Sequence, residues 1–245
     1  MEKYLFQELS TLGQKHWWFT SKKKIVLSLV EKYLEGEVKD NKILDIGCGS
    51  GFMLDSLRKF GTVYGMDTSD EAIALSRQVF DGEIKKGFLP DDLPFPKESF
   101  NLILALDVLE HVAEDRASLD GICAHLKDDG VFIITVPAYM FLWSHHDVVH
   151  AHQRRYKFDE LQDKLKNSGF EILKISYLNS LLFLPIFLVR KFNNLMKRKK
   201  GSDAKMPNKY VNILFEKIFS FEKYLLGLMN FPFGVSLVAV VRKKK

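Results

Sequence analysis

The chain has 245 residues, of which 47% are apolar and 27% charged, which is the composition of a globular protein. It excludes a disordered or collagen-like chain, and the length suits one large domain, residues 1–245. Two cysteines cannot build a disulfide framework, which favours a reducing, cytoplasmic setting. The longest apolar run, residues 181–189, is shorter than the roughly 20 residues that a membrane-spanning helix needs.

The net charge of +5 is unevenly distributed along the chain. Residues 190–200 carry six basic residues and no acidic one, and residues 242–245 carry four more. Without these ten residues, the chain has 26 basic and 31 acidic residues, so the rest of the chain is mildly acidic. A protein that binds nucleic acid spreads its basic residues along a groove, so we expect no nucleic-acid partner. The two basic patches need another explanation.

Residues 1–40 are predicted to form an N-terminal helical cap, and residues 41–177 the core of the domain. In the core, short apolar runs alternate with helical stretches, a pattern that predicts a doubly wound α/β sheet. Ser69 is a candidate N-cap for the second of these helices. The predicted strands are residues 42–46, 62–67, 84–87, 101–106 and 131–136, and the predicted helices between them are residues 52–60, 69–80 and 108–126.

After Pro137 the alternation is interrupted. Residues 138–157 are rich in aromatic residues and histidines and are predicted to form an insertion on the substrate side. A helix at 158–168 and a strand at 170–177 follow, and residues 235–245 supply the final strand and a basic tail. Between them, residues 178–234 are predicted to form a helical, apolar insertion that acts as a lid or as a membrane contact.

The sharpest motif is ILDIGCGSGF, residues 43–52, in which a strand leads through three glycines into a helix. Such a turn brings backbone N–H groups and a helix N-terminus close to a ligand. The glycines fall at Gly47, Gly49 and Gly51, with Phe52 next, and this spacing differs from the G-x-G-x-x-G dinucleotide fingerprint. Asp67 ends the next strand, where a carboxylate can accept both hydroxyl groups of a ribose. Together these features predict an adenosine-containing ligand.

Four segments resemble the class I S-adenosylmethionine-dependent methyltransferases. They are LDIGCGSG, MDTS, LPFPKESFNLILALDVLEHV and GVFIITVP, and they lie within residues 42–137. The resemblance implies S-adenosyl-L-methionine as cofactor and a Rossmann-like, doubly wound α/β sheet of seven strands with the last strand antiparallel.

The resemblance also implies which residues hold the cofactor. The loop from Asp45 to Gly51 is expected to cradle the ribose and methionine parts, and Asp67 to bind the ribose. After the third strand, where many family members carry an aspartate, Phe88 supplies apolar contacts instead. The predicted cofactor-binding residues are Asp45, Gly47, Cys48, Gly49, Gly51, Asp67, Thr68, Phe88, Leu89, Leu106, Asp107 and Lys22.

Two flanking segments resemble a narrower, ubiquinone-methyltransferase-like group. In the N-terminal segment of that group, an aromatic cluster precedes an arginine and covers the cofactor. The corresponding segment here is QKHWWFTSKKKIV, residues 14–26, and Lys22 stands near the arginine position. Packing of the tryptophans in the core of an N-terminal helix is an equally good interpretation. The second segment is WSHHDVVHAHQRRY, residues 143–156.

Methyl transfer to oxygen or nitrogen can need a base near pH 7, and histidine suits that role. His111, His146 and His150 are the candidate catalytic residues. An alternative for Glu110 and His111, which we favour over direct catalysis, is that they cap and orient the helix after the fourth strand. Internal hydrogen bonding within the insertion is a further alternative for the other histidines.

A divalent metal is a second possibility for this insertion, with His146, Asp147, His150 and His152 as ligands. Their spacing matches no strong metal motif, so we predict no metal site. Arg154 and Arg155 can bind an anionic substrate group or pair with internal carboxylates. The predicted substrate-binding residues are Trp143, His152, Arg154, Arg155 and Tyr156.

The apolar stretch 178–189 beside the basic run 190–200 fits docking at an anionic membrane surface. The alternative is that this segment forms a lid over the active site. The membrane contact and the lid are compatible if the acceptor is lipidic. We therefore predict O-methylation of a small or lipid-linked acceptor by a cytoplasmic enzyme, with contact to the inner face of the membrane left open. The alternatives are a nucleotide-dependent oxidoreductase and a non-catalytic, membrane-associated cofactor-binding module.

Overall fold

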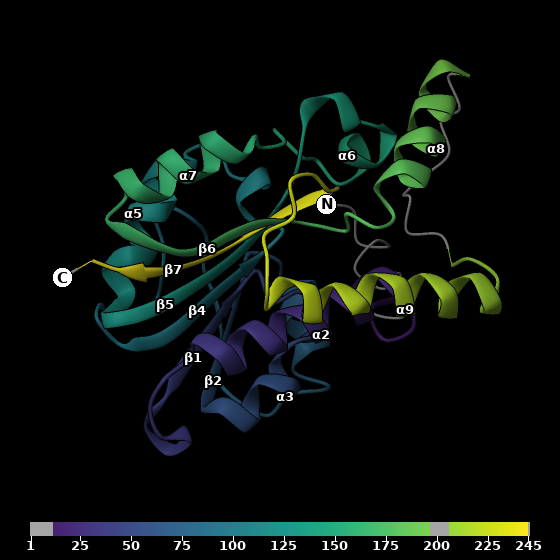
Figure 1. Cartoon of the computed structure of the whole chain (residues 1–245). Coiled ribbons are helices and arrows are strands. Elements are labelled where there is room, and N and C mark those ends of the chain that lie inside the picture. The colour runs from purple at the N-terminus through teal and green to yellow at the C-terminus, as the bar shows by residue number, and fades with distance from the viewer. Residues whose placement is uncertain (1–11, 197–205, 245) are drawn as a thin grey trace.

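The computed structural model describes residues 12–196 and 206–244. Within these residues, seven strands form one mixed sheet through the centre of the molecule (Figure 1). Their order is β3-β2-β1-β4-β5-β7-β6, and β7 alone runs antiparallel to its neighbours, which confirms the predicted sheet. The strands are β1 Lys42–Ile46, β2 Thr62–Asp67, β3 Ile84–Lys86, β4 Phe100–Leu106, β5 Leu126–Pro137, β6 Phe170–Leu178 and β7 Ser236–Lys243.

Helices cover both faces of the sheet. Figure 1 shows α5 and α7 on one side and α2 and α3 on the other. Strands β4 and β5 are therefore apolar on both faces, as in buried parallel sheets, and most of their side chains are inaccessible. The helices are α2 Trp17–Tyr33, α3 Leu54–Leu57, α4 Asp70–Ser76, α5 Asp115–His125, α6 His145–Val149, α7 Phe158–Asn167, α8 Phe183–Leu195 and α9 Lys209–Leu226.

Three predicted helices of the core are shorter than expected, and one of them, predicted at 69–80, ends at Ser76 as α4. The stretch 52–60 forms only the single turn α3, followed by a 3₁₀ turn, η2 Arg58–Phe60. The stretch 108–126 is divided into a 3₁₀ turn, η3 Leu109–His111, and the helix α5. The division occurs because Val112, between the two, has an extended backbone. The Ser69 hydroxyl caps α4 as predicted, by accepting from the Ala72 N–H at 3.3 Å.

The N-terminal helix α2 packs against α9, which comes from the far end of the chain (Figure 1). Trp17 meets Phe215 edge to face, with ring centroids 5.4 Å apart. The Ser220 hydroxyl lies 3.0 Å from that of Ser21, whose own hydroxyl donates to the Glu216 carbonyl at 3.1 Å. Part of the predicted insertion therefore belongs to the same helical layer as the predicted N-terminal cap; residues 1–11 of that cap lie outside the described residues.

Helix α8 differs from α9, the other helix described in the insertion. It has no buried residue, and in Figure 1 it extends away from the sheet. Its base is held by Glu222 of α9, whose carboxylate accepts from the N–H groups of Asn179 at 2.7 Å and Leu181 at 2.9 Å. Basic residues 197–200, which follow α8 in the sequence, lie outside the described residues. Among the helices that are described, none combines the length and the apolar character needed to cross a membrane.

Candidate active site

The three glycines after β1 adopt backbone conformations that favour glycine. The φ angles are +68° at Gly47, +56° at Gly49 and +81° at Gly51. A Cβ atom at Gly47 would lie 2.5 Å from Cγ2 of Val108, whereas one at Gly49 would meet nothing within 4 Å. Gly47 is thus required for packing, while Gly49 faces open space in which a ligand can approach the backbone.

Asp67, at the end of β2, is tied to the glycine loop. Its Oδ2 accepts from the N–H of Gly49 at 2.9 Å, and its Oδ1 accepts from the N–H of Ser69 at 2.9 Å. Each carboxylate oxygen can accept a further hydrogen bond. The two motifs predicted to bind adenosine therefore meet at one place, with Thr68 exposed beside them.

A second carboxylate, Asp45 of β1, lies buried beneath this loop. Burial and the neighbouring charge of Asp67 raise the pKa of Asp45 to about 7. Cys48 is also buried, and burial raises the pKa of its thiol, so its side chain packs rather than reacts. A contribution from Cys48 to ligand binding would have to come from its backbone.

Asp107 follows β4 with a φ angle of +57°. Its Oδ1 accepts from the Thr135 hydroxyl at 2.8 Å, and its Oδ2 forms an ion pair with the buried Lys22 of α2. Burial acts to raise the pKa of Asp107, but Lys22 outweighs it, so this pKa lies below its usual range. The structure thus brings together two predicted cofactor residues, with Leu106 half-buried next to them.

Phe88 and Leu89 lie at the other end of the predicted cofactor site, after β3. Two backbone hydrogen bonds, of 2.8 and 2.9 Å, join Phe88 to Asp92. The Phe88 side chain is 49% exposed and Leu89 is half-buried. An exposed ring at this position can supply the apolar contact expected there.

The histidines gather from two segments, η3 and the insertion after β5. The ring centroids of His146 and His150 lie 4.2 Å apart, and those of His111 and His152 lie 4.8 Å apart. Burial, with a contribution from His152, lowers the pKa of His111 to about 4. Burial also holds the pKa of His146 well below its usual value. Both rings are therefore neutral at pH 7, the form that can accept a proton.

Asp147 of α6 is the internal anchor of the insertion. Its carboxylate accepts from Arg155 Nε at 2.8 Å and Nη2 at 3.0 Å, from His152 Nδ1 at 2.9 Å, and from the Ser144 N–H at 2.8 Å. Arg155 also donates to the Ala138 carbonyl at 3.1 Å. Because these donors occupy the carboxylate, Asp147 is not available as the metal ligand considered above.

The remaining predicted substrate residues also have internal partners. Arg154 forms an ion pair with Asp115 at 2.9 Å, and the buried Tyr156 hydroxyl donates to the same carboxylate at 3.0 Å. The carbonyl of the half-buried Trp143 accepts from Asn194 of α8 at 2.9 Å. These contacts explain the local fold, and substrate binding by these residues stays a prediction.

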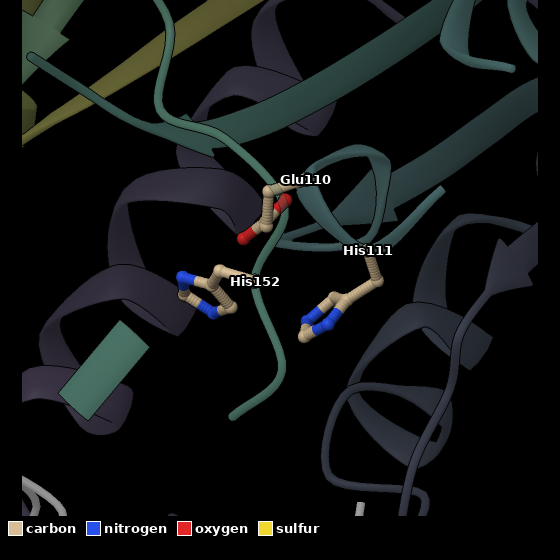
Figure 2. Close-up of side chains that lie close together, drawn as sticks. All are labelled: Glu110, His111 and His152. Atoms are coloured by element: carbon tan, nitrogen blue, oxygen red, sulfur yellow. The ribbon is translucent and has the colours of Figure 1, made fainter. Parts of the chain in front are cut away.

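The environment of Glu110 could not be predicted from the sequence. It is fully buried in η3, and within the described residues neither carboxylate oxygen has a hydrogen-bond partner. Burial, and then the charge of Asp107, hold its pKa well above the usual range. Figure 2 shows its carboxylate beside the rings of His111 and His152. The position of Glu110 and His111 in a separate turn departs from the expected role as caps of one long helix.

The sheet order is that of the S-adenosylmethionine-dependent methyltransferases, and the open face of Gly49 and the carboxylate of Asp67 lie where an adenosyl ligand is expected to bind. The sequence model of the methyltransferase domain family matches residues 16–175, and the chain belongs to this family. S-adenosyl-L-methionine is the methyl donor of the family. This membership decides against the oxidoreductase alternative.

Curated relatives include a ubiquinone biosynthesis O-methyltransferase of Rhodopseudomonas palustris, 33% identical over 101 residues, which are 38% of either chain. An uncharacterized protein of Methanocaldococcus jannaschii is 32% identical over 161 residues, 65% of this chain and 66% of that protein. The chain spans 38–49% of the length of three ubiquinone biosynthesis O-methyltransferases that it matches.

Solved structures share the fold at low sequence identity. A Haloferax volcanii methyltransferase in complex with the Trm112 activator has a TM-score of 0.64 at 18% identity, covering 99% of this chain and 95% of its own. Phosphoethanolamine N-methyltransferase 2 of Haemonchus contortus, in complex with S-adenosyl-L-methionine, has a TM-score of 0.56 at 17% identity. That match covers 90% of this chain and 53% of the other.

Proposed function

We propose that the protein methylates an oxygen of a small or lipid-linked acceptor, and that it takes this acceptor up at an anionic membrane surface. The observation that carries the proposal is helix α8, which has no buried residue and carries several exposed apolar side chains. Leu184 is 62% exposed, Leu188 54% and Phe192 52%. Exposed apolar patches of this kind mark interaction sites.

The charge beside this apolar surface favours a bilayer as the occupant. Arg190 and Lys191 belong to α8 itself, and four more basic residues follow at positions 197–200 of the sequence. Each basic side chain near an anionic leaflet contributes about 1 kcal/mol to binding. An apolar helix with such a basic flank lies in the membrane interface instead of spanning it.

A groove connects this surface to the insertion after β5. It has a volume of about 340 Å³ and lies between α8 and the 3₁₀ turn η4 Met140–Leu142. Its walls include Phe141 and Phe187, whose ring centroids lie 5.9 Å apart. An aromatic or acyl portion of an acceptor fits such a lining. The lining residues are Phe141, Leu142, Phe187, Arg190, Lys191 and Asn194.

For methyl transfer, the main task of the protein is to position the acceptor. The cofactor, when bound, supplies a methyl group on a sulfonium, which is an excellent leaving group. The protein must hold the acceptor oxygen in line with that methyl group and provide a place for the hydroxyl proton. His146, whose ring is neutral at pH 7, is the proposed acceptor of this proton. O-methyltransferases among the relatives support oxygen as the accepting atom.

Vesicle sedimentation tests the membrane part of the proposal. We expect the chain to pellet with anionic phosphatidylglycerol vesicles and less with neutral phosphatidylcholine vesicles. The variant Leu188→Glu/Phe192→Glu should reduce the pelleted fraction roughly tenfold or more, because two apolar contacts become repelled charges. Val38→Glu, at a 52% exposed position far from the insertion in sequence, is the control and should bind as the unmodified chain does.

A labelled-methyl transfer assay tests the acceptor. Lipid and water-soluble extracts of the source cell are incubated with labelled S-adenosylmethionine, and the products are identified by mass spectrometry. Labelled methyl ethers in the lipid fraction support the proposal. Labelling of nitrogen alone would contradict O-methylation, and equal vesicle binding by the unmodified chain and its α8 variant would contradict the membrane surface.

A further inference from the structure

We infer that Glu110, His111 and His152 form a binding site for one divalent transition-metal ion. One ligand atom from each of these side chains lies within 4.8 Å of the other two. Figure 2 shows the carboxylate and the two imidazole rings around one small space, with Glu110 and His111 coming from η3 and His152 from the segment after α6. The residues are thus brought together by the fold, since His152 is about 40 positions further along the chain.

Among the described residues, the carboxyl group of Glu110 has no cationic partner of its own. It is fully buried, and no described residue hydrogen-bonds to either oxygen. A buried carboxylate without a partner is costly, and buried charges are usually paired or bound to metals. Lys22 and Arg155 are near enough to interact with it electrostatically, but each already forms an ion pair. Lys22 pairs with Asp107 and Arg155 with Asp147, so an ionised Glu110 would need a cation other than these two side chains, such as a bound metal ion.

The histidines are held as metal ligands usually are. His152 Nδ1 hydrogen-bonds to Asp147 Oδ1 at 2.9 Å, which orients the ring and leaves Nε2 for a metal. The His111 ring has a backbone hydrogen bond with Ala151. In addition, Gln153 ties the two segments together, because its N–H donates to the Glu110 carbonyl and its side-chain amide to the His111 carbonyl, both at 2.8 Å.

The ligand set indicates the class of ion. Two imidazoles and one carboxylate suit Zn²⁺, Mn²⁺, Fe²⁺ or Co²⁺, whereas Mg²⁺ and Ca²⁺ prefer oxygen ligands. In a tetrahedral site, ligand atoms lie about 3.3 Å apart, so the three side chains close up slightly when an ion binds. Three protein ligands leave at least one position open. Asp107 is near enough to Glu110 to influence its pKa, so the proposed ion lies near this predicted cofactor residue, where a metal would hold an acceptor oxygen.

Direct metal binding tests this inference without any knowledge of the acceptor. The full chain, free of affinity-tag histidines and stripped with chelator, is titrated with Co²⁺ and followed by visible absorption, and with Zn²⁺ and followed by calorimetry. We expect one ion per chain. Glu110→Gln and His152→Ala should each weaken Zn²⁺ binding at least tenfold. His145→Ala, which removes a histidine of the same insertion outside the proposed ligand set, should bind as the unmodified chain does.

Thermal unfolding separates a metal site from a buried neutral acid. Zn²⁺ should raise the melting temperature of the unmodified chain and of His145→Ala, because an ion that binds only the folded state stabilises it. Zn²⁺ should not raise the melting temperature of Glu110→Gln, because glutamine keeps the shape of the side chain but cannot ionise to bind the ion.

Three results would overturn the inference. They are no cobalt absorption and no Zn²⁺-dependent stabilisation in the unmodified chain, equal stabilisation of Glu110→Gln, or loss of Zn²⁺ binding in His145→Ala. If His152→Ala fails to fold, the comparison of Glu110→Gln with the unmodified chain still decides. Since each readout is binding or stability, a failed methyl-transfer assay would leave this result unaffected.

Discussion

Lys22 of α2 and Asp107 at the end of β4 form an ion pair that attaches the N-terminal helix to the carboxyl edge of the sheet. The Lys22 side chain is 8% exposed and that of Asp107 34%, so water only partly screens the pair. The Lys22 ammonium also lies over the Trp18 ring, 5.1 Å from its centroid. The contact therefore ties the predicted aromatic cover of the cofactor to Asp107, a predicted cofactor-binding residue.

Removal of this pair should destabilise the protein. Lys22→Met leaves the Asp107 carboxylate without its cation, and we expect the free energy of unfolding in urea to fall by about 1–3 kcal/mol at pH 7. Lys24→Met is the matched control on the same helix. Lys24 pairs with Glu216 at 2.7 Å but is 50% exposed, so its loss should cost under about 1 kcal/mol.

The loss of stability in Lys22→Met should also depend on pH. Because the folded pKa of Asp107 is below its unfolded value, the pair stabilises the fold above pH ~4 and stops doing so as pH falls through the folded pKa. The difference between the unmodified chain and Lys22→Met should therefore shrink below pH ~4. Equal effects of Lys22→Met and Lys24→Met at pH 7 would contradict the structural role given to this pair.

Asp67 should control cofactor affinity. Asp67→Ala removes the acceptor for the Gly49 and Ser69 N–H groups as well as the predicted ribose contact. We expect the dissociation constant for S-adenosylhomocysteine to rise about 10- to 100-fold in calorimetry, which corresponds to the loss of about one hydrogen bond to a charged group. Asp70→Ala, three residues further at an exposed position, is the control. Unchanged affinity in Asp67→Ala would remove the basis for the adenosine site.

The two glycines Gly47 and Gly49 should respond differently to the same substitution. Both have positive φ, so alanine costs about 1 kcal/mol of backbone strain at either position. At Gly47 the new methyl group also collides with Val108, and Gly47→Ala should show the larger fall in melting temperature. At Gly49 the methyl group enters open space, so Gly49→Ala should fold and lose cofactor affinity.

Thermal melts and S-adenosylhomocysteine calorimetry on both variants provide the comparison. Gly61→Ala is unsuitable as a control, since a Cβ there would lie 2.4 Å from the Asn41 carbonyl. Gly121→Ala suits better, because its nearest neighbour would be 3.5 Å away, in the interior of α5. Full cofactor affinity in Gly49→Ala would show that the ligand does not use the open face of the loop.

The sheet could be predicted because its signals are local. Each buried strand is a short apolar run, and the glycine loop and Asp67 each mark the end of a strand. Parallel strands place those ends at one edge, so the meeting of Gly49 and Asp67 follows from the topology. The break between η3 and α5 could not be predicted, because it depends on the extended backbone at Val112 within an otherwise helical pattern.

The partners of the insertion could not be predicted either, for a different reason. Arg155 and Tyr156 have the residue types of a substrate site, but buried carboxylates from other segments, Asp147 and Asp115, occupy them. Which carboxylate meets which donor is set by how the insertion folds back onto η3. The burial of Glu110 beside His152 has the same origin, since neither residue carries a local signal for the other.

Asp45 should make stability depend on pH in a characteristic direction. Its folded pKa of about 7 is above the unfolded value of about 3.9, so the folded state holds a proton that the unfolded state releases between these values. The free energy of unfolding should therefore fall as pH rises from about 4 to about 7, by at most ~1.4 kcal/mol per pH unit from this group. Asp45→Asn should lack this contribution.

Urea unfolding of both proteins at pH 4.5, 5.5, 6.5 and 7.5 measures the effect. Burial also raises the pKa of Glu222 to about 7, so the unmodified chain alone does not isolate Asp45. The difference in unfolding free energy between the two proteins isolates Asp45, because Glu222 is present in both. Relative to the unmodified chain, Asp45→Asn should gain stability steadily up to pH ~7 and then remain level. A difference that stays constant over this range would mean that Asp45 is ionised in the folded protein, with a cationic partner that offsets its burial.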